Sequence, residues 1–321
     1  MKKIALIVLY YGELPQYTKL FFDSLKYNPT IDVLLFTDQE VKYDGKNLIQ
    51  YKGSFDNMVK RIQSNFEFKI TCDRPYKLCD YRPAYGYIFK EELKEYDFWG
   101  HCDLDMILGN LRKYLPEQLL DKYSKIYQHG HLCLYKNTNE NNIRFMEKGG
   151  KNYKEVFTTS ISCIFDEVEG IQKKYDLLNI PTYKNRVCAD ISPWHDDFQV
   201  VESYLSKEDK INFNYEQQVF YWEKGHIFRA YINKRGDVQR DEFNYLHFQR
   251  RNMDFDEDVI KNDETFFITR QGIIKKEDYK LPSVEKITEL NSKRKIKELQ
   301  KKIEYYIYIW KRRFNKYILQ K

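Results

Sequence analysis

Long apolar runs separated by polar turns mark the first part of this 321-residue chain. The continuous apolar run Ile4–Leu9 predicts a buried strand of the kind found in parallel sheets. The largely apolar segment Ile31–Thr37 is a second predicted buried strand, and Asn47–Tyr51 is a third predicted strand. Apolar residues recur at helical spacing after Pro15 and along Phe55–Phe66. This alternation of strands and helices predicts an α/β domain with a mostly parallel sheet.

Further elements are expected downstream, with less regular spacing. The sequence predicts a helix that begins near Pro83, strands at His131–Tyr135 and Ser160–Phe165, and a helix over Gly170–Leu178. A strand is also expected at Phe243–Arg251 (FNYLHFQRR), where apolar and polar residues alternate. We therefore expect one catalytic domain over residues 1–255, followed by a connecting segment over residues 256–283 that packs on it.

The apolar start of the chain could also be a secretion signal. Its apolar run is only about eight residues long, has no small-residue cleavage site and ends in Gly12–Pro15, so a first strand is the better interpretation. No stretch approaches the ~18–20 apolar residues that a membrane-spanning helix needs. The six cysteines include no C-x-x-C pair, which fits reduced thiols in a cytoplasmic protein.

The stretch Tyr96–Leu111 (YDFWGHCDLDMILGNL) carries the main chemical signal. A buried strand is expected to end at Gly100–Cys102 and to deliver Asp103 and Asp105 to its tip, where side chains two residues apart share one face. Divalent cations that sit between protein and phosphate prefer such carboxylates, and apolar flanks make two adjacent charges costly without a counter-ion. This predicts an Mn²⁺ or Mg²⁺ site. The alternative is a solvated strand end.

Other polar residues cluster near predicted strand ends or ahead of a helix. Tyr10, Tyr11 and Asp38 follow strands, and ligands collect at the carboxyl ends of parallel strands. The stretch PYKLCDYRP, which begins at Pro75, places Lys77, Asp80 and Arg82 just before the helix expected near Pro83. A Lys and an Arg ahead of a helix N-terminus favour phosphate binding. A surface loop with an internal ion pair is the alternative.

Two later segments contain weaker candidates for a general base and for a ligand. The Pro-broken stretch Ala189–Val200 contains Asp196 and Asp197, either of which could act as a general base, although a solvated Asp pair is equally consistent with the pattern. His247 lies in a predicted strand. A single His there is structural more often than it is a ligand.

Together these residues resemble the nucleotide-sugar-dependent glycosyltransferases of the GT-A fold. The chain is similar, more closely, to a bacterial GT-A-like family associated with capsule and surface-polysaccharide loci. The resemblance rests on PYKLCDYRPAYGYIF and YDFWGHCDLDMILGNLRKYL and extends weakly from residue 1 to about residue 250. It implies a GT-A, Rossmann-like domain with a mostly parallel central sheet.

The resemblance also implies roles for individual residues. Asp103 and Asp105 match the Asp-x-Asp motif that binds Mn²⁺ or Mg²⁺ beneath the donor diphosphate, and His247 matches a late His that completes the metal shell. Three further groups match donor-binding positions: Tyr10, Tyr11 and Gly12 at the nucleotide, Asp38 near the base, and Lys77, Asp80 and Arg82 near phosphate and sugar. No family motif identifies the catalytic base, so inversion and retention both remain open.

The last part of the chain differs in charge from the rest. The whole chain carries a formal net charge of +6, but eleven Lys or Arg stand against two Glu between Lys293 and Lys321, which leaves the remainder at −3. Apolar residues recur at three- and four-residue spacing over residues 284–321 and predict a basic amphipathic helical tail. Such a helix is attracted to anionic lipid. A coiled-coil homodimer, or packing on the chain's own domain, would use the same spacing.

The prediction is therefore a cytoplasmic glycosyltransferase, peripheral at the inner face of the membrane. It would move a sugar from a nucleotide sugar, expected to be a UDP-sugar, to a lipid-linked or glycan acceptor in surface-polysaccharide biosynthesis. Nucleic acid is not an expected partner, because the body is mildly acidic and has no recognised binding motif. Two alternatives remain: a nucleotidyl- or phosphoryl-transferring enzyme with the same metal site, and a non-catalytic, membrane-tethered scaffold of this fold.

Overall fold

The structure is a computed structural model that describes residues 1–185, 188–191, 198–200, 214–249, 265–269, 272–278 and 280–291, together with residues 255, 303, 306 and 307. The chain forms two compact units. Unit 1 comprises Met1–Met106 and Asn110–Arg186, and unit 2 comprises Ile107–Gly109 and Val187–Lys321. The boundary between the units falls inside the range 1–255 for which the sequence predicts a single domain.

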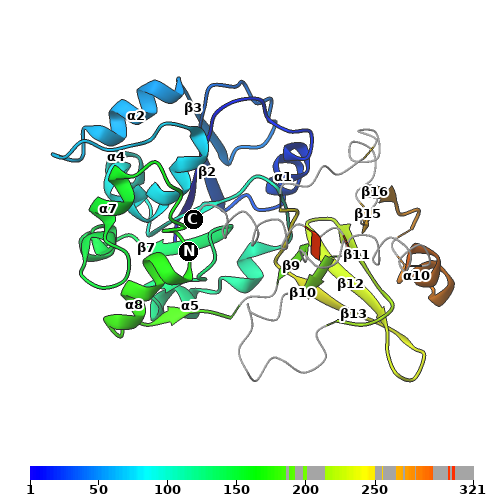
Figure 1. Ribbon diagram of the computed structural model, residues 1–321. Coiled ribbons are helices and arrows are strands. Elements are labelled where there is room, and N and C mark those ends of the chain that lie inside the picture. The colour runs from blue at the N-terminus through cyan, green and yellow to red at the C-terminus, as the bar shows by residue number, and fades with distance from the viewer. Residues whose placement is uncertain are drawn as a thin grey trace. The chain divides into compact units, whose positions relative to one another are not determined.

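A seven-stranded sheet forms the centre of unit 1, with the order β3-β2-β1-β4-β7-β6-β8. Strands β1, β2, β3 and β4 run parallel to one another, whereas β7 is antiparallel to both β4 and β6. The prediction of a mixed α/β fold with a parallel-rich central sheet is confirmed (Figure 1). The strands are β1 (Ile4–Tyr10), β2 (Ile31–Thr37), β3 (Leu48–Lys52), β4 (Phe98–Cys102), β6 (Lys125–Ile126), β7 (Leu132–Lys136) and β8 (Thr182–Tyr183).

The order of the strands reverses beside β1. The chain runs from β1 to β2 and then β3 on one side, and returns to place β4 on the other side of β1. In parallel sheets, ligands bind outside the carboxyl ends of the strands at such a reversal point. The candidate ligand edge of unit 1 is therefore the edge at which β1, β2 and β4 end.

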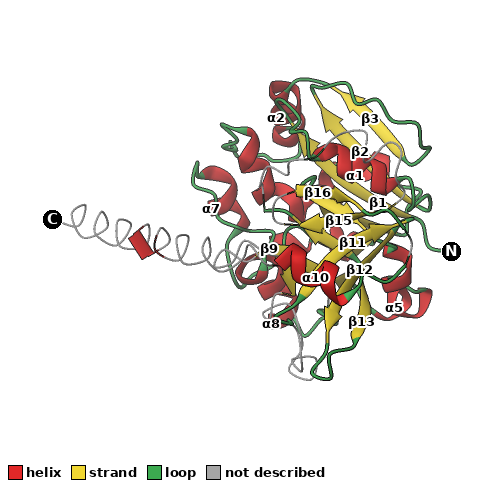
Figure 2. Ribbon diagram, turned by 90° about the vertical axis from the view of Figure 1, so that its right-hand side faces the viewer, coloured by secondary structure: helices red, strands yellow, loops and turns green. Residues whose placement is uncertain are grey.

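Short helices surround this sheet, and α1 and α2 lie on opposite sides of it (Figures 1 and 2). Helix α1 buries Leu20, Phe21 and Leu25, the residues expected to form its apolar face. The α-helices of unit 1 are α1 (Thr18–Leu25), α2 (Phe55–Gln63), α3 (Tyr85–Ile88), α4 (Lys90–Leu93), α5 (Glu117–Lys122), α6 (Asn139–Asn142), α7 (Tyr153–Thr158) and α8 (Lys173–Leu177). Three 3-10 helices, η1 (Pro75–Ala84), η2 (Leu111–Tyr114) and η3 (Arg144–Met146), and a π-helical turn, η4 (Val168–Gln172), complete it.

One expected element is wrong. Residues 160–165 form a loop rather than a strand, because the amides of Cys163 and Phe165 bond to the Asp80 carboxylate instead of a neighbouring strand. The helix expected to begin near Pro83 corresponds to α3, which begins at Tyr85. The segment before it is η1, so Lys77, Asp80 and Arg82 lie within a 3-10 helix rather than in a loop. None of the six cysteines, all of which lie in the described part of the chain, forms a disulfide.

Unit 2 contains two sheets. A four-stranded sheet has the order β10-β9-β14-β5, and a five-stranded antiparallel sheet has the order β13-β12-β11-β15-β16. The first consists of β5 (Met106–Leu108), β9 (Cys188–Ile191), β10 (Phe198–Val200) and β14 (Tyr245–His247). The second consists of β11 (Gln218–Glu223), β12 (His226–Ile232), β13 (Val238–Phe243), β15 (Thr265–Thr269) and β16 (Gly272–Lys275). The strand expected at Phe243–Arg251 corresponds to the end of β13 and to β14, and Arg250 and Arg251 lie outside the described residues.

The helix α10 (Val284–Asn291) packs on the five-stranded sheet (Figure 2). Ile287 is fully buried in a cluster with Val219, Tyr221 and Phe267, and the Asn291 side chain donates a hydrogen bond to the Gln218 carbonyl. The first eight residues of the predicted basic tail therefore form a helix that packs on unit 2 through the buried Ile287. Among the residues that the structure describes, no helix has the length and apolarity needed to cross a bilayer.

Candidate functional site

The carboxyl ends of β1, β2 and β4 bring together polar residues from three parts of the sequence. Tyr10 pairs with Thr37 at the ends of β1 and β2, and Ile7 pairs with His101 near the end of β4. The antiparallel strand β7 begins at this edge as well, and the Asp103 amide donates to the His131 carbonyl at 3.1 Å. The residues just after these strands form the candidate site of unit 1.

Asp103 and Asp105 converge, as their spacing predicts. Their carboxylate oxygens lie within 4.8 Å of each other, while Leu104 between them is buried. Asp103 remains partly exposed, with 28 % of its side chain accessible, and Asp105 is buried. Two carboxylates held this close at a strand end could serve as ligands of a divalent cation.

Arg82 links Asp103 to a second carboxylate. Its guanidinium forms an ion pair with Asp103 through Nη2, and its Nη1 donates to Asp166 Oδ2 at 2.9 Å and to the Gly130 carbonyl at 3.0 Å. One guanidinium thus forms ion pairs with two carboxylates, and the carboxylate of Asp105 is a third negative charge nearby. Among the described residues of this cluster, negative charge exceeds positive charge, which favours a bound cation.

Burial sets the protonation of this cluster. Burial raises the pKa of the Asp166 carboxyl to about 6, although the neighbouring Arg82 guanidinium opposes the shift. Burial alone would lower the pKa of Arg82, but the charges of Asp103, Cys79 and Asp166 raise it well above its ordinary value. Arg82 therefore stays cationic at any ordinary pH, whereas Asp166 loses its charge as the pH falls through about 6.

The turn after β1 is fixed by Asp38. The Gly12 amide donates to Asp38 Oδ1 at 3.0 Å, and this hydrogen bond lowers the pKa of the exposed Asp38 carboxyl. Gly12 has φ +103°, a conformation that a residue with a side chain rarely adopts. Tyr11 is buried edge-on against Phe55, with ring centroids 5.6 Å apart. Residues predicted to meet the nucleotide therefore form one connected turn at the carboxyl edge.

Lys77 and Asp80 are buried and contact each other, whereas Arg82 contacts Asp103 of the candidate site. Lys77 Nζ donates to Asp80 Oδ2 at 2.7 Å, to the Val156 carbonyl at 2.9 Å and to the Ile161 carbonyl at 2.7 Å. All three N–H groups of the ammonium thus have protein partners. Their contacts support a role in holding residues 161–165, and a direct contact with donor remains a prediction.

In unit 2, His247 ends β14 and lies beside Asp190 of the parallel strand β9. His247 Nδ1 is 3.2 Å from Asp190 Oδ1, and the Asp190 side chain is fully buried. A buried carboxylate beside Nδ1 restricts the orientation of the imidazole ring. The two candidate bases, Asp196 and Asp197, lie outside the described residues.

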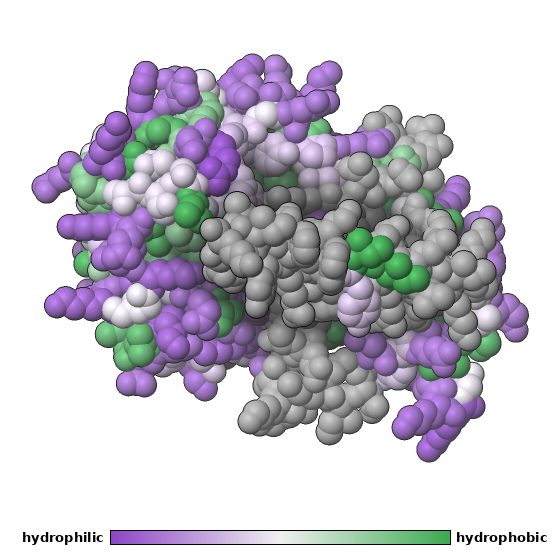
Figure 3. All heavy atoms as spheres, viewed as in Figure 1, coloured by the Kyte–Doolittle hydropathy of each residue, from purple (hydrophilic) through white to green (hydrophobic). Residues whose placement is uncertain are grey.

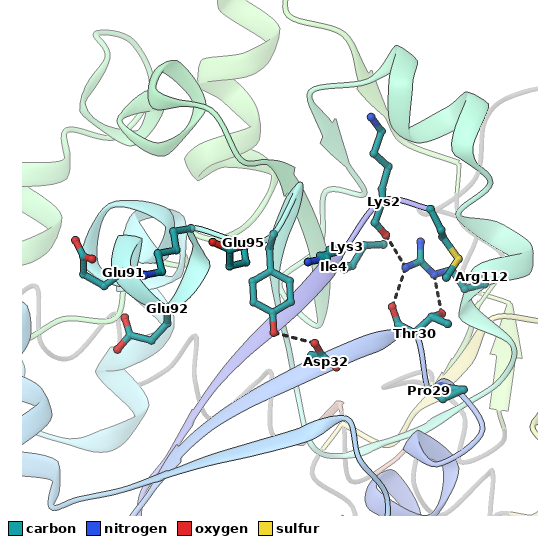
Figure 4. A pocket seen from close by; sticks show the side chains of 13 residues that line it. Lys2, Lys3, Ile4, Pro29, Thr30, Asp32, Glu91, Glu92, Glu95 and Arg112 are labelled. Atoms are coloured by element: carbon teal, nitrogen blue, oxygen red, sulfur yellow. Dashed lines mark hydrogen bonds between the residues drawn. The ribbon is translucent and has the colours of Figure 1, made fainter.

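A surface hollow of about 490 Å³ in unit 1 lies away from these residues (Figure 4). It is found at the amino ends of β1 and β2, where Tyr96 donates to Asp32 at 2.8 Å and Arg112 donates to Thr30 and to the Lys2 carbonyl. Arg112 thus ties the start of the chain to the residue before β2. Parallel sheets bind ligands at the opposite edge, so we do not assign the hollow to the candidate site.

Asp166 and the Gly130 carbonyl were not predicted as site groups. Asp166 follows the apolar run that was expected to form a strand, and an acid after an apolar run is the only signal present. Gly130 acts through its backbone, which leaves no side-chain signature.

The chain belongs to a known protein family. The model of the "Family of unknown function (DUF6625)" matches residues 6–277. None of the curated proteins matches the chain. Among solved structures, the chain is similar to the apo-form glycosyltransferase GlyE of Streptococcus pneumoniae TIGR4, at 13 % identity and a TM-score of 0.29. That match covers 57 % of this chain and 45 % of the GlyE chain, and the fold and site described above do not depend on it.

Proposed function

We propose that this protein is a metal-dependent glycosyltransferase that uses a nucleotide-sugar donor. The observation that carries the proposal is the convergence of Asp103 and Asp105 at the strand-reversal edge of the parallel sheet, with Arg82 beside them. A nucleoside diphosphate is bound by a cation, a nearby basic side chain and backbone turns at strand ends. The features of this edge that support the proposal are two carboxylates that could hold a cation, the Arg82 guanidinium and the turn at Gly12.

In the proposed reaction the bond between the sugar C1 and the donor phosphate oxygen breaks, and a bond from C1 to an acceptor hydroxyl oxygen forms. The hydroxyl proton leaves with a base, for which Asp196 and Asp197 remain the candidates. Negative charge develops on the departing diphosphate, and Arg82 is the cationic side chain placed to stabilise it. The turn of Tyr10, Tyr11 and Gly12, held by Asp38, would bind the nucleotide.

The residues present fit a divalent cation. Asp103 and Asp105 would hold Mn²⁺ or Mg²⁺, which supplies Lewis-acid stabilisation of the diphosphate when bound. His247 remains the predicted third ligand, and its Asp190 neighbour is the kind of partner that commonly orients a metal-binding imidazole. Each of the three residues is therefore tested separately.

Product analysis tests the proposed reaction class. Incubation with UDP-sugars and Mn²⁺ is expected to release UDP together with free sugar or glycosylated acceptor. Release of UMP and a sugar phosphate would instead indicate a nucleotidyl- or phosphoryl-transferring enzyme. A non-catalytic scaffold would bind the donor weakly or not at all and would form neither product.

The nucleotide preference is a separate prediction. We expect UDP with Mn²⁺ to raise the melting temperature more than GDP or CMP does, because ligand that binds only the folded state stabilises it. Asp38→Ala should reduce this shift, since it frees the Gly12 turn. Asp56→Ala, at an exposed position in the first turn of α2, is the matched control and should leave the shift unchanged. A larger shift with GDP or CMP than with UDP would contradict the assignment.

We also propose that the acceptor is linked to a lipid and that the basic tail brings the enzyme to the cytoplasmic membrane face. Ile303, Tyr306 and Ile307 are helical and 53 %, 69 % and 47 % exposed, and residues three and four apart share one helix face. Eleven basic residues occur between Lys293 and Lys321. Apolar side chains on one face together with excess positive charge suit an anionic bilayer.

Truncation after Asn291 is expected to abolish flotation with anionic liposomes and to leave donor binding intact. This end point keeps α10, whose Ile287 lies in the core of unit 2, whereas truncation at Val284 would remove it. Flotation of the full chain should fall as salt rises, because the Debye screening length is about 8 Å at physiological ionic strength and becomes shorter at higher salt. Equal flotation of the truncated and the full-length protein would show that the tail is not needed for liposome binding. A dimer that the truncation converts into a monomer, without liposome binding, would favour the coiled coil.

A further inference from the structure

The loop of residues 159–166, which follows α7, places its backbone polar groups inward. The amides of Cys163 and Phe165 donate to the buried Asp80 carboxylate at 2.8 and 3.0 Å, and the Ile161 carbonyl accepts from Lys77 Nζ at 2.7 Å. Lys151 Nζ donates to the Cys163 carbonyl. A buried ion pair thus holds the loop from beneath, and its backbone has little freedom to move.

Two isoleucines of the same loop point into solvent. Ile161 is 71 % exposed and Ile164 is 58 % exposed, which makes them the most exposed large hydrophobic residues described in unit 1 apart from Met1. Figure 3 shows that hydrophilic side chains predominate on the visible surface around α2 and α4 in this unit. The loop therefore inverts the usual arrangement, because its charged supports are buried and its apolar side chains are exposed.

Ile164 is also strained. Its φ is +54°, in the left-handed region that β-branched residues rarely adopt. Strained backbone, buried charge and exposed apolar surface each cost stability, and all three occur in one short loop. Strain of this kind persists where the surrounding contacts enforce it, and it is concentrated at functional sites.

The loop connects directly to the candidate site. Asp166, two residues after Ile164, accepts the hydrogen bond from Arg82, which in turn forms the ion pair with Asp103. The two isoleucines thus stand on the segment that supplies a site carboxylate. A molecule that has both a polar group and an apolar chain could bind the candidate site with the first and the two isoleucines with the second.

We propose that Ile161 and Ile164 bind the alkyl chain of an amphiphilic acceptor. The inference rests on the proposed glycosyl transfer and adds a specificity surface for the acceptor. Nearby cations already have protein partners, since Arg74 contacts Asp73 and Ser162 and Lys151 contacts the Cys163 carbonyl. This favours an apolar chain over the headgroups of an anionic bilayer as the occupant.

Methyl NMR on the full chain, with ¹³C-labelled isoleucine, tests the assignment. The probe is n-octyl β-D-glucoside below its micelle-forming concentration, with methyl β-D-glucoside as the short-chain comparison. We expect saturable shifts of the Ile161 and Ile164 methyl signals with the octyl compound only. Ile161→Ser and Ile164→Ser, each followed through the methyl signal of the isoleucine that remains, should weaken octyl glucoside binding at least tenfold. Ile143→Ser, at a residue of unit 1 that is 43 % exposed, should have no effect.

A stability measurement separates function from packing. Ile164→Gly should raise the melting temperature by a few degrees, because glycine adopts φ +54° without strain, and should also weaken octyl glucoside binding. Unchanged octyl glucoside binding in Ile164→Gly would overturn the proposal, as would equal shifts at Ile143, or binding of the protein through these two isoleucines to anionic vesicles but not to octyl glucoside.

The probe needs neither donor nor metal. Octyl glucoside binding without UDP release in the product assay would therefore refute the proposed reaction and leave the alkyl site supported. UDP release without octyl glucoside binding would refute the alkyl site alone.

Discussion

Asp103→Asn and Asp105→Asn are each expected to reduce metal-dependent turnover of nucleotide sugar by at least about 100-fold, the size of the loss when one preorganised electrostatic group is removed from an active site. The physical reason is that an amide cannot replace a carboxylate at a divalent cation. Calorimetric titration with Mn²⁺ and UDP should show the loss directly as weakened metal-dependent binding. Asp121→Asn, at a residue 63 % exposed and paired with Lys2, is the matched control and should behave as wild type.

The two variants should differ in the stability of the metal-free protein. Asp103→Asn removes the ionic partner of Arg82 and should lower the free energy of unfolding by about 1 kcal/mol, because a partly exposed charged hydrogen bond is lost. Asp105→Asn should raise it, since it ends the repulsion between two carboxylates within 4.8 Å of each other. Unchanged Mn²⁺ and UDP affinity in both variants would exclude a metal site at these residues.

His247→Ala tests the third predicted ligand independently. If His247 binds metal, the loss of Mn²⁺ affinity should persist in His247→Gln, which retains a polar side chain but no imidazole. If its role is only to pair with Asp190 in unit 2, the variants should lose stability and keep their Mn²⁺ affinity.

Apolar runs allowed much of the central sheet to be predicted. The expected strand Ile31–Thr37 matches β2 in full, and Ile4–Leu9 lacks only Tyr10 of β1, because fully buried parallel strands are continuous apolar runs. The convergence of Asp103 and Asp105 followed from strand geometry in the same way. These features are local, so the sequence around them contains the necessary information.

The misassigned segment depends on contacts far away in the sequence. Residues 160–165 contain apolar residues that fit a strand, but their amides bond to Asp80, more than eighty residues earlier. A pattern of apolar positions cannot show that a carboxylate will replace a neighbouring strand as the acceptor. The exposed positions of Ile161 and Ile164 follow from the same contact, which explains why they could not be predicted.

Charge alone also misled the interpretation of Lys77 and Asp80. Lys and Asp are almost never fully buried unless they are paired, so the sequence favoured exposed groups that bind phosphate. Arg82, in the same 3-10 helix, reaches the site instead. Which of the three charged side chains faces the ligand edge is decided by how η1 packs against residues 156–166, and that packing has no local signal.

Breaking the Lys77–Asp80 pair should be among the most destabilising changes to unit 1. Lys77→Met leaves the Asp80 carboxylate buried without its cation, and Asp80→Ala leaves the Lys77 ammonium and the amides of Cys163 and Phe165 without their acceptor. Removing one partner of a buried ion pair typically costs about 3–5 kcal/mol. Urea unfolding should therefore show each single variant destabilised by roughly that amount.

A surface pair supplies the control for this prediction. Lys26 and Asp44 also form a Lys–Asp ion pair, at 2.6 Å, but their side chains are 35 % and 80 % exposed. Lys26→Met should cost below about 1 kcal/mol, because water solvates the charge that remains. The double variant Lys77→Met/Asp80→Leu should lose less than the sum of the single variants, since it removes both buried charges together.

The same variants distinguish support of the loop from direct donor binding. If Lys77 supports residues 161–165, Lys77→Met should lower stability, broaden the Ile161 and Ile164 methyl signals and weaken octyl glucoside binding, with little change in UDP affinity under conditions where the variant is folded. If Lys77 contacts the donor phosphate, as the sequence suggests, UDP affinity should fall by about 1–3 kcal/mol, the usual value for a charge-assisted hydrogen bond, while stability changes little. Full burial of the Lys77 ammonium, with three protein acceptors within 2.9 Å, favours the first outcome.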